Sequence, residues 1–197
     1  GWRREQIAAR LENTLVGFDA QMFLQLTSQS EGQLFPDTYL IPFQASPSDI
    51  LNIFLKNLAK KTGLDPQSGA DREILILASL VEREAKSDPD RGLISGILKK
   101  RLANNWPLQV DATIQYAANR ADNWWQPITD TKYPSPYNTY LYPGLPPGPI
   151  CNPGLAALRA VAFPAQTPYY YFRAACDGSG NHLFAETYEQ HLANECP

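Results

Sequence analysis

Apolar residues recur three to four positions apart along most of this chain, which is the spacing of helices that bury one face. In the third such stretch, Ser46 and Pro47 mark a helix start and Gly63 marks its end. The pattern predicts helices over residues 4–13, 18–26, 50–58, 74–81, 93–102, 112–119, 154–163 and 187–194. We therefore expect a mainly helical protein.

The helix over residues 74–81 is apolar on nearly all sides, which is typical of a helix inside a core. Glu82 follows directly, so its carboxyl is expected where the core ends, partly shielded from water. Shielding of this kind raises a pKa and suits a general acid. The competing interpretation is a surface glutamate paired with Lys86 one turn later. Glu84 lies about 200° around the helix from Glu82, so the two carboxyls cannot act as a pair.

Two short stretches near the C-terminus favour strands. Residues 169–174 and 182–184 are rich in aromatic and apolar side chains, and the sequence Asp-Gly-Ser-Gly at 177–180 between them is typical of a turn. A single hairpin among helices places the chain in the α+β class.

Residues 121–153 show no periodicity, and seven of the 17 prolines lie between Pro134 and Pro153. A compact domain usually keeps so long a loop because the loop has a function. Its tyrosines, amides and hydroxyls suit a sugar, whose apolar faces stack on rings while its polar groups form hydrogen bonds. A proline-stiffened structural strap is the alternative.

The composition allows a sizeable core and argues against nucleic acid as a partner. Hydrophobic residues make up 44% of the 197 residues, and the formal net charge is -3 without a long basic run. No stretch reaches the roughly 20 apolar residues of a membrane helix. Because the first residues enter a helical pattern directly, an export signal or membrane anchor is expected outside this chain.

Three cysteines without a Cys-x-x-Cys spacing, and two histidines without a nearby acidic cluster, give no pattern of a metal site. Two interpretations of the cysteines remain open: a bridge between Cys176 and Cys196, or three unpaired thiols.

Several ordered motifs resemble the MltG/YceG family of lytic transglycosylases, and the resemblance covers essentially the whole chain. They lie at residues 31–39, 77–84, 108–113, 135–140, 144–150 and 152–154. The resemblance implies a remnant of a LysM-like lobe over residues 1–30. It implies a lysozyme-like, YceG-like catalytic domain over residues 31–197.

The resemblance also implies which residues form the site. Glu82, the first glutamate of the Val-Glu-Arg-Glu segment, matches the catalytic position. The expected substrate-binding residues are Glu84, Gln109, Asp111, Thr113, Tyr137, Asn138, Thr139 and Tyr140.

Family chemistry implies endolytic cleavage of the β-1,4 bond between N-acetylmuramic acid and N-acetylglucosamine in peptidoglycan. The 6-hydroxyl of the muramic acid attacks its own anomeric carbon, so one carboxyl suffices and 1,6-anhydro ends result. No metal or organic cofactor is expected. The enzyme is expected to end nascent strands.

The resemblance further implies peptidoglycan synthases as partners and a full-length protein anchored in the inner membrane. Its site would face the extracytoplasmic, periplasmic side of the cell envelope. Two alternatives remain: a peptidoglycan hydrolase that uses Asp111 or Glu31 as a second carboxylate, and a non-catalytic glycan-binding protein.

Overall fold

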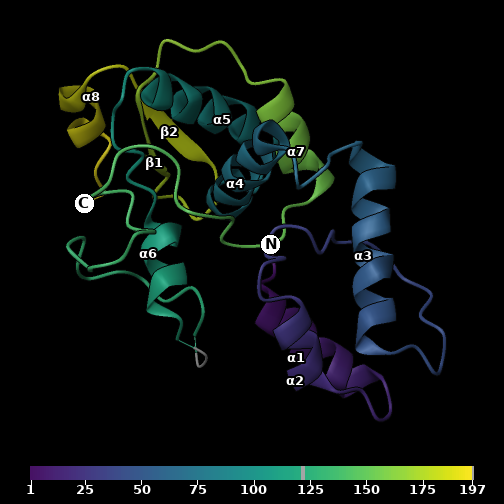
Figure 1. Cartoon of the computed structure of the whole chain (residues 1–197). Coiled ribbons are helices and arrows are strands. Elements are labelled where there is room, and N and C mark those ends of the chain that lie inside the picture. The colour runs from purple at the N-terminus through teal and green to yellow at the C-terminus, as the bar shows by residue number, and fades with distance from the viewer. Residues whose placement is uncertain (121–122, 197) are drawn as a thin grey trace.

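The computed structural model describes residues 1–120 and 123–196, and these residues form a mainly helical α+β fold (Figure 1). The helices are α1 (Arg4–Thr14), α2 (Ala20–Leu26), α3 (Pro47–Thr62), α4 (Gly69–Glu84), α5 (Asp88–Ala103), α6 (Asp111–Ala118), α7 (Leu155–Ala162) and α8 (Tyr188–Ala193). The strands are β1 (Tyr171–Ala174) and β2 (His182–Ala185). The predicted class, helices and hairpin are thereby confirmed.

The first three helices share a small core of their own. Phe23 of α2 is fully buried, and its ring lies 6.4 Å from that of Phe54 on α3. Helix α3 begins as predicted, because Ser46 accepts a hydrogen bond from the Asp49 amide, and it ends at Gly63 with a left-handed φ of 74°. This core includes side chains of α3, whereas the division of the chain at residue 30 remains a prediction.

Helix α4 is the centre of the larger core, as its apolar sequence predicted. Its residues from Leu75 to Val81 are buried, and it packs against α5 and α7 (Figure 1). Ser79 on this helix accepts a hydrogen bond from the Ile150 amide at 3.0 Å. The long loop is therefore fastened to the central helix near the point where α4 ends.

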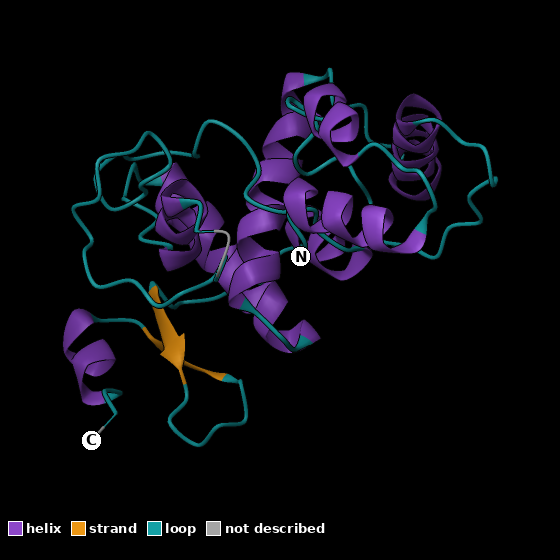
Figure 2. Ribbon diagram, turned by 90° about the horizontal axis from the view of Figure 1, so that it is seen from below, coloured by secondary structure: helices purple, strands orange, loops and turns teal. Residues whose placement is uncertain are grey.

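The C-terminal part is a hairpin covered by a short helix. Strands β1 and β2 pair antiparallel, and α8 packs against both (Figure 2). A disulfide joins Cys176 to Cys196, so the interpretation with three unpaired thiols is wrong. The bridge ties the residues after α8 to the residues after β1.

Residues 123–153 contain no helix or strand, as predicted for the long loop, and its residues 121 and 122 lie outside the described residues. Among the helices that the structure describes, none has the length and apolar character needed to cross a membrane.

Candidate active site

The end of α4 places Glu84 in the wall of a cavity of about 590 Å³, which we call the cleft. Its walls come from the ends of α4 and α5, the start of α6, the long loop, the hairpin and α8. The lining residues are Glu84, Arg101, Gln109, Asp111, Tyr140, Tyr171, Phe172, Arg173, Ala174, His182, Tyr188 and His191. Four of the residues predicted from sequence, Glu84, Gln109, Asp111 and Tyr140, are thus brought together.

Glu84 has the protonation behaviour of a general acid. Burial of its carboxyl and, to a smaller extent, the negative charge of Asp111 raise its pKa to about 7, against an opposing effect of Arg83. Asp111 is held in turn by the Tyr140 hydroxyl, which donates a hydrogen bond to Asp111 Oδ1 at 2.5 Å. A carboxyl with a pKa near neutrality can both give and take a proton at the pH of the cell.

Hydrogen bonds between two sequence motifs build the wall around Asp111. The Gln109 amide donates to the Thr139 carbonyl at 3.1 Å, and the Val110 amide donates to Thr139 Oγ1 at 3.0 Å. Thr113 and Thr139 bring their hydroxyls within 3.1 Å of each other. Both threonines are buried and do not line the cleft, and they hold the start of α6 in place; their role in substrate binding remains a prediction.

Asn138 also lies beneath the surface. Its Nδ2 donates to the carbonyls of Thr131 and Tyr133, and its Oδ1 accepts from the Tyr140 amide at 2.9 Å. These bonds fix the turn that presents Tyr140 to the cleft. Tyr137 packs its ring 4.9 Å from that of Tyr116 and does not line the cleft either.

Glu82 points to a different part of the molecule. Its side chain is 20% exposed, its Oε2 accepts from the Gly154 amide at 3.2 Å, and its Oε1 lies 3.3 Å from the backbone nitrogen of Gly1. Gly154 is the cap residue of α7, where the helix dipole favours a carboxylate. Lys86 is exposed and forms no ion pair with Glu82 in the described part of the chain, so that surface pair is not observed. The catalytic role of Glu82 remains a prediction.

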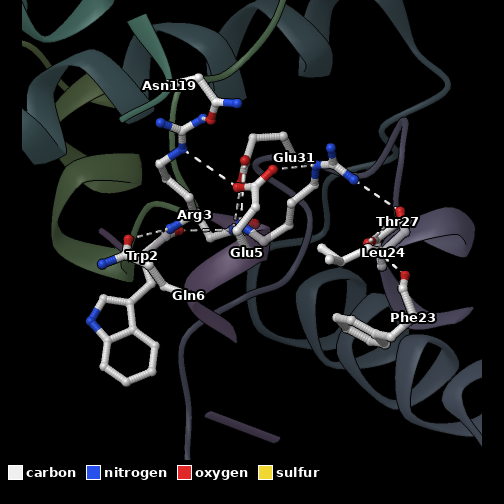
Figure 3. Close-up of polar contacts among 11 residues, drawn as sticks. Trp2, Arg3, Glu5, Gln6, Phe23, Leu24, Thr27, Glu31 and Asn119 are labelled. Carbon is white, nitrogen blue, oxygen red and sulfur yellow. Dashed lines mark hydrogen bonds and ion pairs between the residues drawn. The ribbon is translucent and has the colours of Figure 1, made fainter. Parts of the chain in front are cut away.

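Glu31, weighed from sequence as a second carboxylate, does not line the cleft. It is buried beside the N-terminal segment, where it accepts from the Arg4 amide at 3.3 Å and from Asn152 Nδ2 at 2.7 Å. Burial raises its pKa to about 7. Figure 3 shows Glu31 among the polar contacts of Arg3 and Glu5.

Sequence reasoning did not find the part of the cleft that comes from α5, the hairpin and α8. Arg101 sits on an ordinary amphipathic helix, yet it is buried and donates to the carbonyls of Tyr170 and Leu108. His182 is held by Asp90, whose Oδ2 lies 2.9 Å from both its backbone nitrogen and its Nδ1. The family resemblance, which covers essentially the whole chain, was the one available signal for this part.

No group of three or more His, Cys, Asp or Glu side chains within residues 1–120 and 123–196 is placed to hold a metal ion.

Fold and site together define a mainly helical α+β protein with an acidic, aromatic-lined cleft beside its central helix. The model of the YceG-like family matches residues 1–196, and the chain belongs to that family.

Curated relatives and a solved structure agree with this assignment. An endolytic murein transglycosylase of Bacillus subtilis (strain 168) is 35% identical over 170 residues, which is 82% of this chain and 46% of the relative. One from Streptococcus pneumoniae (strain R6) is 32% identical over 176 residues, which is 83% of this chain and 31% of the relative. The chain thus spans less than half the length of either relative.

The crystal structure of a YceG-like protein from Listeria monocytogenes superposes with a TM-score of 0.84 at 26% identity. The match covers 98% of this chain and 73% of the Listeria chain.

Proposed function

We propose that this chain is the glycan-cleaving part of an endolytic lytic transglycosylase, with Glu84 in place of Glu82 as its general acid and base. The observation that carries the proposal is the position of Glu84. Its carboxyl has a pKa of about 7 and lines the same cleft as Gln109, Asp111 and Tyr140. Glu82 instead accepts a hydrogen bond from the cap of α7.

In the proposed reaction, protonated Glu84 donates its proton to the glycosidic oxygen as the bond to the anomeric carbon of N-acetylmuramic acid breaks. The 6-hydroxyl of the same sugar then forms a bond to that carbon, and Glu84 takes the hydroxyl proton. The enzyme returns to its starting protonation state, and the product carries a 1,6-anhydro ring. The attack is intramolecular, so no second carboxylate is required.

Asp111 supports a second candidate, a hydrolase in which it activates water opposite Glu84, because both carboxyls line the cleft. The Tyr140 hydroxyl already occupies Asp111 Oδ1. The products distinguish the two reactions by mass, since hydrolysis adds one water that the anhydro product lacks.

Family membership supports the wider biological proposal. The full-length protein acts on peptidoglycan strands at the extracytoplasmic face of the cell membrane, held there by an anchor outside this chain, and ends nascent strands alongside peptidoglycan synthases. Residues 1–30 are the remnant of a LysM-like lobe, and the catalytic domain is lysozyme-like.

The test compares Glu84→Gln with Glu82→Gln in the full-length protein on purified peptidoglycan strands. Glu84→Gln is expected to lower turnover about 100- to 10,000-fold, because a general acid contributes that much. Glu82→Gln should stay within about tenfold of the parent. Circular dichroism checks that both variants are folded.

Mass analysis of the products should show anhydro ends. The reverse order of the two variants would return the acid role to Glu82. A parent protein that binds strands without cleaving them would make the domain a glycan-binding module.

A further inference from the structure

The cleft is lined by charged side chains of both signs from different elements. Glu84 and Asp111 line it from the end of α4 and the start of α6, whereas Arg173 and His191 line it from β1 and α8. We call the first the acidic part, where the proposed chemistry takes place, and the second the cationic part.

In the cationic part, the guanidinium of Arg173 on β1 makes only long contacts, so its N–H donors are open to a ligand. Its Nη1 lies 3.4 Å from the His191 carbonyl, and its Nη2 lies 3.7 Å from Glu195 Oε1. Both contacts are longer than an ordinary hydrogen bond. Glu195 is 67% exposed, so this ion pair contributes little and is easily displaced. Arg101, by contrast, is buried and spends its donors on two backbone carbonyls.

The position of Arg173 is fixed by its surroundings. It lies opposite Leu183 in the antiparallel ladder, and the Cys176–Cys196 bridge ties the end of the hairpin to the segment after α8. A side chain on a paired strand is better placed for recognition than one on a free loop. The neighbouring His191 has a buried Nδ1 without a hydrogen-bond partner in the described residues. Burial is the main cause that lowers the pKa of His191, and the positive charge of Arg173 is the second.

We infer that Arg173 is a specificity-determining residue that binds a carboxylate of the stem peptide carried by the muramic acid. The inference rests on the proposed function. The sugars of a peptide-bearing strand are uncharged, and their carboxylates belong to the peptide. The planar fork of a guanidinium matches a carboxylate with two parallel hydrogen bonds. In this arrangement the cationic part of the cleft binds the peptide, and the acidic part cleaves the glycan.

The experiment measures kcat/KM of the full-length protein on soluble strands with native peptides and on the same strands after their carboxyls are converted to methylamides. Arg173→Gln is expected to lose about 10- to 100-fold on native strands, the value of a charge-assisted hydrogen bond, and to stay within about twofold of the parent on methylamide strands. Arg173→Lys should recover part of the loss. Arg159→Gln, an exposed arginine on α7 outside the cleft, is the matched control.

An equal loss on both substrates would show that Arg173 only shapes the cleft and would overturn the inference, as would no loss on either. Strands stripped by an amidase expose the lactyl carboxylate instead, and an equally large effect there would also overturn the assignment to the peptide. Equilibrium binding of native and methylamide strands to Glu84→Gln, with and without Arg173→Gln, gives a readout without turnover. That readout separates failure of this inference from failure of the proposed function.

Discussion

Glu31 and Glu84 share one chemical property and differ in where they lie. Burial is the main cause that raises the pKa of each to about 7. Glu31 is sealed between the N-terminal segment and Asn152, whereas Glu84 keeps part of its surface open to the cleft. A raised pKa therefore reports burial, and only access to a cavity makes such a carboxyl available for chemistry.

The residues around the two carboxyls also differ. The Arg4 amide and Asn152 Nδ2 donate to the two oxygens of Glu31, so this side chain joins the first helix to the segment that precedes α7. Burial raises the pKa of Glu84 most, and the negative charge of Asp111, which lines the same cleft, adds to the effect. Glu31 therefore joins two segments of the chain, whereas Glu84 lines the cleft.

The largest effect expected from this comparison concerns stability at Glu31. Its folded-state pKa lies above the ordinary value of 4.5, so the folded state binds more protons and stability falls as pH rises from 4.5 to about 7. This one group should cost roughly 3 kcal/mol of unfolding free energy over that window. Glu31→Gln keeps the acceptor for Asn152 and should remove this part of the pH dependence, with turnover little changed.

Denaturant unfolding at several pH values between 4.5 and 8 measures the effect. Glu12→Gln, an exposed glutamate on α1, is the control and should leave the slope unaltered. If Glu31→Gln unfolds with the same pH slope as the parent, Glu31 is not the buried acid described above.

For Glu84, a pKa of about 7 should appear in the pH dependence of kcat/KM. In the proposed reaction Glu84 must be protonated, so kcat/KM is expected to be constant below pH 7 and to fall about tenfold for each pH unit above it. Glu31→Gln and Lys86→Met should leave this limb unmoved, because neither side chain lines the cleft. A limb near the ordinary glutamate value, or one that shifts in Lys86→Met, would point to a different acid.

The sequence was sufficient to predict α4 as the central helix, because a helix that is apolar on nearly all sides, as over residues 74–81, is stable only inside a core. It also showed that Glu82 and Glu84 face different directions. It could not show which direction is the cleft, because that depends on what packs against each side. The cap of α7 meets Glu82, while α6, the loop and the hairpin surround Glu84.

The same limit applies to the loop motifs. The resemblance implied that Gln109 and Tyr140 belong to one site, and the hydrogen bonds from Gln109 and Val110 to Thr139 join the start of α6 to the turn near Tyr140. Asn138, by contrast, has a side chain that suits a sugar and spends its hydrogen bonds on the backbone of its own loop. Residue type alone cannot distinguish an asparagine that binds a sugar from one that holds its own loop, because both roles use the same side-chain amide.

The smallest predicted effect tests how Asp111 acts on Glu84. Asp111→Asn keeps the oxygen that accepts from Tyr140 but removes the negative charge that raises the pKa of Glu84. The basic limb should move to lower pH, so kcat/KM should fall about two- to fivefold at pH 8 and change little at pH 5.5. Asp88→Asn on α5, 81% exposed and outside the cleft, is the control. A loss of about 100-fold or more at every pH would instead make Asp111 the base of a hydrolase, with Glu84 as its acid.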